Sequence, residues 1–192
     1  MEIFATRGFH STTMVQISKE SQYPLGTIYK YFSGKQEIYH DLVVGRVHDL
    51  GHVLFSIKQD GGLSACDKLW ACMKAQARFY RANQEVVKIY ISERSNIDAV
   101  AMPKLNERVN RLHEKMVCLF RDIMAQGIES NEIKAYPERD MAELFSDIVH
   151  SAAWSSLFRE EDDNQLNQRL SMIFEMFTQG VMETGKDGKP ES

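Results

Sequence analysis

The sequence has little of what marks several large protein classes. Only three of its 192 residues are cysteines, and no two of them form a C-x-x-C pair. This argues against a disulfide framework and against a zinc ribbon, and it fits a reducing cytoplasm. Glycine and proline number 11 and 4, too few for a fibrous or low-complexity chain. We expect Cys66, Cys72 and Cys118 to be small core residues or surface thiols.

Long apolar runs and catalytic signatures are also missing. No uncharged apolar stretch approaches the ~18–20 residues of a membrane-spanning helix. Residues 1–7 have no apolar region behind a basic start, so we expect no signal peptide. The patterns G-x-S-x-G, G-x-G-x-x-G, H-E-x-x-H and the P-loop do not occur. The sequence therefore predicts a cytoplasmic protein that is not an enzyme and carries no cofactor.

What is present is typical of a folded globular chain, with 43% hydrophobic and 26% charged residues. The net charge of −4 is unevenly spread. Residues 1–46 carry five Lys or Arg against four Asp or Glu, whereas residues 47–192 carry 18 against 23. Because the acidic remainder repels a polyanion, any nucleic-acid contact is expected at the N-terminal end. Chance explains a difference of this size equally well.

Apolar residues recur at helical spacing through most of the chain, and strand-like alternation is confined to residues 86–91. We therefore predict an all-α fold with about nine helices. Gly8 ends the first helix, Thr12 or Thr13 caps the second, and Pro24 and Pro103 start the third and seventh. The expected helices cover about residues 1–7, 13–21, 24–32, 35–58, 63–83, 84–95, 103–127, 138–158 and 164–184.

The segment between Gly8 and Lys35 contains two of these helices, joined by a turn at residues 21–23. Neither helix is stable alone in water, so their apolar residues must pack together and against the first helix. This arrangement is a helix-turn-helix, whose second helix faces outward and fits the major groove of B-DNA. The residues expected inside are Ile3, Phe4, Val15, Ile17, Ile28 and Phe32. Those expected on the outer face are Leu25, Gly26, Thr27, Tyr29, Lys30 and Tyr31.

The run from Gly26 to Phe32 (GTIYKYF), followed by Lys35 and preceded by Gly8-Phe9, Thr12-Thr13 and Ile17, resembles the DNA-binding signature of the TetR family of transcriptional regulators. The resemblance covers about residues 1–46. It implies that Thr13 caps the second helix near a phosphate and that Thr27 and Lys35 hold the DNA backbone. Gly26 allows close approach, Leu25, Tyr29 and Lys30 face bases or flanking phosphates, and Tyr31 contacts phosphate.

The sequence departs from that family's pattern in three ways. Residues 1–5 match only the last part of the family's first helix, so either the start is misassigned or the chain is truncated. Gln22 replaces the glycine of the turn, and the backbone there must avoid positive φ or accept strain. Pro24 and Leu25 stand where a hydroxyl and a polar or basic residue are usual, although Leu25 could touch a thymine methyl.

The resemblance further implies a helix-turn-helix domain at 1–46 and a ligand-binding and dimerisation domain at 47–184. We expect residues 185–192 to form a disordered tail. Bulky, soft side chains with a few polar neighbours can line an apolar ligand cavity, although such residues are also ordinary core. The candidate ligand-binding residues are Trp70, Met73, Tyr90, Asn96, His113, Met116, Phe120, Phe145 and His150.

The last two helices carry two apolar stripes, more than the end of a single-chain core needs, and residues 151–156 are rich in small side chains. We predict that they form half of a four-helix dimer interface, with intramolecular burial as the alternative. The candidate interface residues are Ser151, Ala152, Ser155, Phe158, Leu170, Phe174 and Phe177. His48 and His52 have the i, i+4 spacing of metal ligands, but we expect an ordinary, partly buried pair and no metal.

The function that the resemblance implies is a homodimeric repressor. It is released from a palindromic operator by a small, largely apolar effector, and helix 36–58 links the effector pocket to the DNA-binding domain. Its expected partners are double-stranded DNA, the effector and a second copy of the chain, with no membrane. The alternative is a helical ligand-binding or scaffold protein whose helix-turn-helix is impaired.

Overall fold

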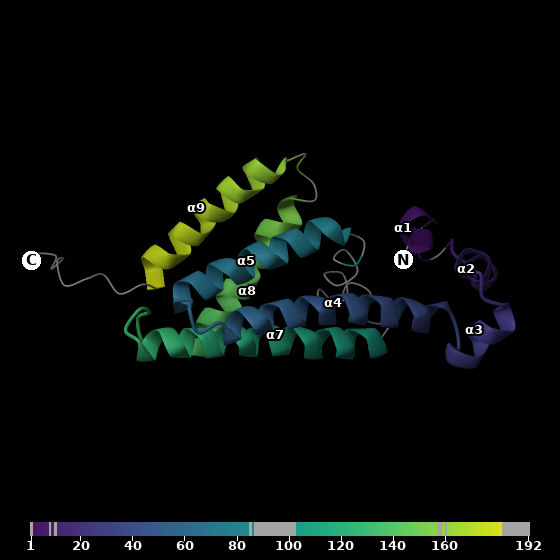
Figure 1. Ribbon diagram of the computed structural model, residues 1–192, viewed down its shortest axis with the longest axis horizontal. Helices are drawn as coiled ribbons and strands as arrows, with labels where there is room; N and C mark the ends of the chain where they lie inside the picture. The colour runs from purple at the N-terminus through teal and green to yellow at the C-terminus, as the bar shows by residue number, and fades with distance from the viewer. Residues whose placement is uncertain are drawn as a thin grey trace, which may run out of the picture.

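The structure, a computed structural model, describes residues 2–7, 9, 11–84, 86, 103–156, 159 and 161–181. Within these residues all regular elements are α-helices, which confirms the predicted all-α fold (Figure 1). The helix expected at 84–95 lies almost wholly outside the described residues, as does the expected disordered tail.

Most predicted helix boundaries agree with the observed ones to within two residues, because caps and prolines act locally. Thr13 is the N-cap of the second helix, and Pro103 is the first residue of the long seventh. The helices are α1 (Glu2–Arg7), α2 (Met14–Ser21), α3 (Leu25–Tyr31), α4 (Lys35–Gln59), α5 (Ala65–Ala82), α7 (Pro103–Glu129), α8 (Glu138–Ser156) and α9 (Asp163–Val181).

The helices α1 to α3 and the start of α4 form a small head at one end of the molecule (Figure 1). Its core is the buried trio Phe4, Ile17 and Ile28, with Met14 among the half-buried residues around them. The prediction that Val15 lies inside is wrong, since 64% of Val15 is exposed. Met14 and Ile17 are three residues apart and share a face of α2, whereas a residue two positions from Ile17 points away.

The remaining helices form the body, in which α4 leaves the head and runs side by side with α7 (Figure 1). α5 packs against α4, α7, α8 and α9, and α7 packs against α8. One continuous core results, in which Leu54 of α4, Met73 of α5 and Phe120 of α7 are almost fully buried. Cys72 lies in this core, and burial raises the pKa of its thiol to about 12. Cys66 and Cys118 are half-buried free thiols.

The end of α7 is fitted closely against the start of α5. A Cβ added to Gly127 would lie 2.6 Å from Cδ1 of Ile133 and 2.9 Å from Cβ of Ala65. The backbone N–H of Ala65 donates to Oε2 of Glu132 at 2.9 Å, so a carboxylate just beyond α7 satisfies a first-turn amide of α5. These contacts fix the end of α7 against the start of α5.

Candidate DNA-binding, effector and dimer sites

The helix-turn-helix begins with a complete capping box. The backbone N–H of Gln16 donates to Oγ1 of Thr13 at 3.3 Å, and the N–H of Thr13 donates to Oε1 of Gln16 at 2.9 Å. Two amides at the start of α2 are satisfied in this way. The prediction that Thr12 or Thr13 caps this helix is confirmed for Thr13. Thr13 is exposed, and its contact with a phosphate stays a prediction.

For the turn between α2 and α3, the sequence left two conformations open: a backbone that avoids positive φ at Gln22, or a strained one. The structure adopts the strained conformation. Gln22 has φ 60° and ψ 15°, in the left-handed region that favours glycine. The hydroxyl of Ser18 donates to the carbonyl oxygen of Tyr23 at 2.6 Å and ties the turn back to α2. The turn therefore has a left-handed backbone at a residue that carries a Cβ.

α3 presents most of the predicted DNA-contacting residues to solvent. Pro24 precedes the helix, and its carbonyl accepts from the N–H groups of Thr27 at 2.8 Å and Ile28 at 3.1 Å. Ile28 points into the head, whereas Tyr29 is 51% and Tyr31 75% exposed. Gly26 and Lys30 are also exposed, and Leu25 and Thr27 are half-buried. One face of α3 anchors the helix, which leaves the opposite face accessible.

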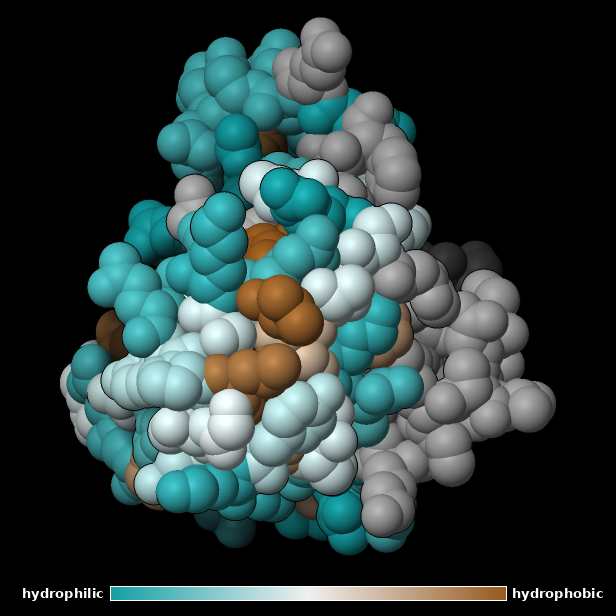
Figure 2. All heavy atoms as spheres, turned by 90° about the vertical axis from the view of Figure 1, so that its right-hand side faces the viewer, coloured by the Kyte–Doolittle hydropathy of each residue, from teal (hydrophilic) through white to brown (hydrophobic). Residues whose placement is uncertain are grey.

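Figure 2 looks onto the end of the molecule that carries the head. Hydrophilic residues cover most of this face, around a small hydrophobic patch. The exposed cations of the head include Arg7, Lys19 and Lys30, whereas Arg46 lies 4.0 Å from a carboxylate oxygen of Asp49. A polar face with several cations suits contact with phosphates.

Lys35 has a structural position inside the head. Its Nζ donates to the carbonyl oxygens of Phe9 and Thr12, both at 2.8 Å, and lies 4.7 Å from the centre of the Phe9 ring. These contacts join the start of α4 to the segment before α2. Lys35 thus helps to hold α1 and α2 in place, and a contact with DNA stays a prediction.

The junction between head and body contains an ion pair and a histidine. Nη1 of Arg108 on α7 lies 3.0 Å from Oδ1 of Asp41 on α4. Partial burial lowers the pKa of His40, and the nearby guanidinium of Arg108 lowers it further, against the opposing effect of Asp41 and Glu37. The head-proximal part of α4 is therefore tied electrostatically to the body.

The predicted effector residues fall into separate groups. Met73, Met116, Phe120 and Phe145 belong to the central core, where the rings of Phe120 and Phe145 meet edge to face at 5.0 Å. Trp70 instead lies at the junction of α5 and α9, with its ring 5.2 Å from that of Phe174. The predicted residues Tyr90 and Asn96 lie outside the described residues.

A buried polar cluster lies beside this core. His150 on α8 contacts the carbonyl oxygen of Ser146 through Nδ1 at 2.8 Å, and its ring centre is 5.6 Å from that of Tyr80 and 5.9 Å from that of His113. The structure therefore brings together His113 and His150, both predicted from the sequence, and adds Tyr80 from α5.

Gln76 is a residue that the sequence analysis missed. It is fully buried, and neither its amide nitrogen nor its amide oxygen has a hydrogen-bond partner among the described residues. A buried polar group without a partner costs about 1–3 kcal/mol. The signal was its spacing: Gln76 stands three residues after Met73 and four before Tyr80, on the inward stripe of α5.

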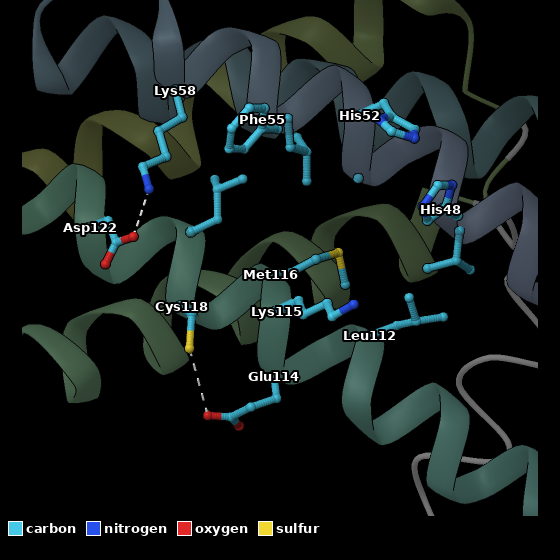
Figure 3. Close-up of a pocket in the computed structure, with 14 residues that line it drawn as sticks. His48, His52, Phe55, Lys58, Leu112, Glu114, Lys115, Met116, Cys118 and Asp122 are labelled. Carbon is cyan, nitrogen blue, oxygen red and sulfur yellow. Dashed lines mark hydrogen bonds and ion pairs between the residues drawn. The ribbon is translucent and has the colours of Figure 1, made fainter.

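A groove of about 410 Å³ runs between α4 and α7 (Figure 3). His48 and His52 lie at one end, with ring centres 4.3 Å apart, and Nζ of Lys58 donates to Asp122 at 2.6 Å at the other. Both histidines are exposed, so the expected partial burial is wrong. Among the described residues no group of three or more His, Cys, Asp or Glu is placed to hold a metal ion.

The predicted dimer residues are divided between core and surface. Ala152, Leu170 and Phe177 are buried in the single-chain core, which leaves them little surface for a second chain. Ser151 is exposed, Ser155 and Phe174 are half-buried, and Phe158 lies outside the described residues. A groove of about 630 Å³ between α8 and α9 is lined mainly by apolar side chains. The exposed apolar residues that line it are Tyr136, Leu144 and Met176.

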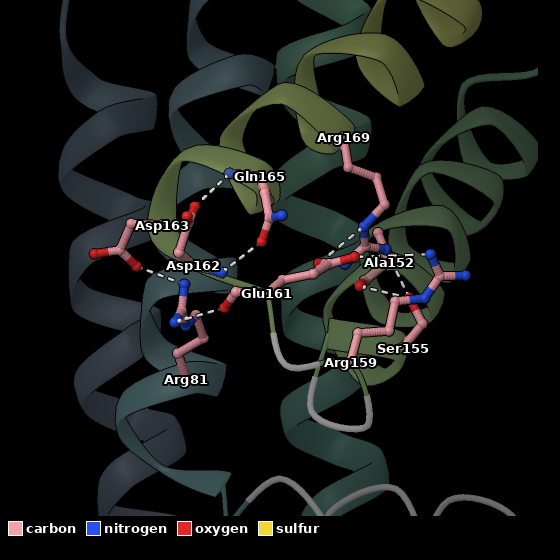
Figure 4. A network of polar contacts seen from close by, with 9 residues as sticks. All are labelled: Arg81, Ala152, Ser155, Arg159, Glu161, Asp162, Asp163, Gln165 and Arg169. Carbon is pink, nitrogen blue, oxygen red and sulfur yellow. Dashed lines mark hydrogen bonds and ion pairs between the residues drawn. The ribbon is translucent and has the colours of Figure 1, made fainter.

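Ion pairs fix the corner between α8 and α9 (Figure 4). The guanidinium of Arg169 donates to Glu161 at 2.8 Å and to the hydroxyl of Ser155 at 2.6 Å. Arg81 of α5 pairs with Asp163 and donates to the carbonyl oxygen of Glu161 at 3.2 Å. These contacts hold α9 against α5 and α8, so the apolar face of α8 and α9 is presented on a fixed support.

Comparison with known proteins places the N-terminal segment in a defined family. Residues 1–42 match the family model described as bacterial regulatory proteins, tetR family. The chain is also 24% identical over 138 residues to the fatty acid metabolism regulator protein of Bacillus subtilis. That match covers 70% of this chain and 66%, just under two thirds, of the relative.

Solved structures share the whole fold. The transcriptional regulator FadR of Bacillus subtilis, solved in complex with stearoyl-CoA, has a TM-score of 0.73 and 19% identity over 93% of this chain and 94% of its own. A TetR/AcrR-family regulator of Thermobifida fusca has a TM-score of 0.75 and 14% identity over 93% and 92%. No described helix is long and apolar enough to cross a membrane. Residues 1–42 thus match the tetR family of bacterial regulatory proteins, and the chain shares its fold with solved transcriptional regulators.

Proposed function

We propose that the chain acts as a homodimeric repressor that binds a palindromic operator and is released by a small, largely apolar effector. The observation that carries this proposal is the exposed outer face of α3, with Tyr29, Lys30 and Tyr31 in solvent and Ile28 anchored below. The proposal assigns DNA binding to residues 1–46 and effector binding and dimerisation to residues 47–184. It places the protein in the cytoplasm, together with its DNA target.

Operator binding follows from the geometry of a helix in the major groove. The contacts of each head with phosphates supply affinity and register, and side chains on α3 read base edges. Gly26 has no atom within 4 Å of an added Cβ, so the backbone of α3 is open to close approach at this point. Two heads related by a two-fold axis reach successive major grooves when they are ~34–36 Å apart, which makes the operator a palindrome.

The apolar face of α8 and α9 supports the dimer. Leu144 and Met176 line the apolar groove between these helices and stay more than half exposed in the single chain. Exposed apolar patches of this kind mark interaction surfaces. A second copy that places its own α8 and α9 there forms a four-helix interface and buries both faces.

The apolar core of the body and the ligand of a related regulator together support one class of effector. The core around Met73, Phe120 and Phe145 is apolar, and a related regulator was solved with stearoyl-CoA. A long-chain acyl compound is therefore the effector that we propose to test first. α4 links this core to the head, and the pair Asp41–Arg108 joins α4 to α7 near the head. An effector that favours a different position of α4 weakens operator binding by a coupling free energy of ~1–3 kcal/mol.

The test is a fluorescence anisotropy titration of the chain against DNA from its own upstream region. Tyr29→Ala should weaken sequence-selective binding about tenfold or more and leave the fold unchanged. Phe55→Ala is the matched control, since this aromatic side chain is equally exposed (54%) but lies on α4 in the body. Stearoyl-CoA should lower the operator affinity of both the wild type and the control.

The alternative, a helical ligand-binding or scaffold protein with an impaired helix-turn-helix, is favoured by two observations in the head. Gln22 holds a strained turn, and the ammonium of Lys35 is bound to two carbonyl oxygens. Absence of selective DNA binding at any salt concentration, for a chain that is folded and still binds stearoyl-CoA, would establish this alternative.

A further inference from the structure

We propose that Gln76 binds the polar group of the effector, and that this group is neutral: a carbonyl, ester, thioester or hydroxyl, and not a carboxylate. This inference rests on the proposed function, because it assumes that an effector enters the body. It goes further by assigning the recognising residue and the chemical class of the group recognised.

The first observation is the state of the Gln76 side chain. Its amide is fully buried, and both polar atoms are without a hydrogen-bond partner among the described residues. Folding withdraws a donor and an acceptor from water at this point, and no described residue offers either of them a hydrogen bond. A ligand group with its own donor or acceptor would satisfy them.

The second observation is the position of Gln76 at the boundary of the polar cluster and the apolar core. Tyr80 lies one turn further along α5 on the same face, and its ring is 5.6 Å from that of His150. Met73 and Ala77, its neighbours on α5, belong to the apolar core. A molecule with an apolar chain and one polar group finds both kinds of surface here.

The charges around Gln76 favour a neutral group. On α5, the residues one turn before and one turn after Gln76 on the same face, Met73 and Tyr80, are uncharged. The buried cation of α5, Lys68, stands two turns earlier, and its Nζ donates to Oε1 of Gln126 at 3.2 Å. A carboxylate buried beside Gln76 would need a cation, and a histidine could supply one only by taking up a proton in a largely apolar setting. A carboxamide matches a carbonyl or hydroxyl without such a change.

The experiment compares three probes with the same twelve-carbon chain: methyl laurate, 1-dodecanol and laurate. Binding to the full-length chain is measured by calorimetry, and release of operator DNA is measured by anisotropy. The wild type should bind the ester and the alcohol at least about tenfold more tightly than laurate. Gln76→Leu should weaken binding of the ester and alcohol about tenfold or more and abolish this preference.

The unfolding temperature separates ligand recognition from a structural role. Gln76→Leu and Gln76→Met remove a buried, unpartnered amide, so the ligand-free variants should unfold at the same or a higher temperature than the wild type. A variant that is as stable as the wild type but binds the neutral probes more weakly supports recognition by Gln76. Lys68→Met is the matched control, because it removes a buried polar group of α5 that already has a partner, and it should keep the wild-type preference.

Three results overturn the inference or a part of it, and they differ in what they imply for the proposed function. If Gln76→Leu binds the ester and alcohol as the wild type does, and operator DNA is still released, the inference fails and the repressor proposal stands. If the wild type binds laurate as tightly as the neutral probes, the neutral-group assignment fails. If none of the probes binds the wild type, the inference fails, and the proposed apolar effector fails with it when stearoyl-CoA also leaves the operator affinity unchanged.

Discussion

Gln22 shows how a single residue can work against the turn that contains it. α2 must end and α3 must begin within three residues, and this requires a left-handed backbone at position 22. Glycine adopts that conformation without the steric penalty of a Cβ, which costs roughly 1–2 kcal/mol. The head keeps the turn because its own core and the hydrogen bond from Ser18 to Tyr23 hold both helices.

Gln22→Gly should therefore stabilise the protein, by about 1 kcal/mol after the greater entropy of glycine in the unfolded chain is subtracted. Thermal unfolding followed by circular dichroism measures the change. Gln22→Ala is the control, since alanine keeps the Cβ and should bring no such gain. A lower unfolding temperature for Gln22→Gly would contradict the left-handed backbone at this position.

His40 gives the folded state a dependence on pH at the junction of head and body. Burial, and then Arg108, lower its pKa below the ordinary value of 6.5. As the pH falls through 6.5, the unfolded chain takes up a proton at this residue before the folded chain does. The contribution of His40 to stability is thus complete above pH 6.5 and declines below it.

We expect His40→Gln to reduce the loss of stability between pH 7.5 and pH 5.5. The readout is the difference in unfolding temperature between the two pH values for wild type and variant, which cancels the effect of the five other histidines. His52→Gln, on the exposed side of the same helix, controls for the loss of an imidazole from α4. Equal differences for wild type and His40→Gln would show that this residue does not titrate as expected.

A glycine weakens helix α4 but allows close packing at the end of α7. The sequence of each helix alone does not reveal which of these two roles its glycine has. Gly45 lies in the middle of α4, and an added Cβ would meet no atom within 4 Å. Gly127 lies in the last turns of α7, where Ile133 and Ala65 occupy the space that a Cβ would need. The first glycine only weakens its helix, whereas the second allows α7, its following turn and α5 to approach closely.

The two alanine substitutions should therefore change stability in opposite directions. Gly45→Ala should raise the free energy of unfolding by about 0.5–1 kcal/mol through helix propensity. Gly127→Ala should lower it by about 1–3 kcal/mol, because the core must shift to admit the methyl group. Urea unfolding of both variants measures the changes, and each serves as the control for the other. A stabilising Gly127→Ala would refute the close packing at the end of α7.

At the scale of the whole molecule, α4 belongs to both the head and the body. Its first turns pack on the head core through Ile38, Tyr39 and Leu42, and its later turns supply Val47 and Leu54 to the body core. A rigid helix shared by two cores transmits a rotation of one to the other. In the proposed dimer, the distance between the two heads then depends on how α8 and α9 of both copies meet, far from the DNA.

Met176→Glu should convert the proposed dimer to a monomer and reduce operator affinity. Met176 is 69% exposed in the single chain, so the charge is tolerated in the monomer but would be buried in the interface. Size-exclusion chromatography with light scattering gives the mass, and anisotropy gives the affinity. Val53→Glu, an exposed aliphatic position on α4, is the control and should stay dimeric. If Met176→Glu stays dimeric, the two chains meet through another face.

The sequence by itself determined the helices and the DNA-binding motif, because both depend on short-range chemistry. Caps, prolines and the spacing of apolar residues act within a few positions, so Thr13, Pro103 and the buried Ile17 and Ile28 were predictable. The outer face of α3 followed from the same reasoning, since a seven-residue helix with one buried face must expose the other.

Only the tertiary structure decided what covers each apolar face. Periodicity shows that one side of α8 or α9 is apolar, but not whether the same chain or a second one buries it, and Leu170 and Phe177 proved to be core. The carbonyl groups that accept from Lys35 lie 23 and 26 residues away in sequence. Such contacts depend on how helices pack across the whole molecule, and no local pattern encodes them.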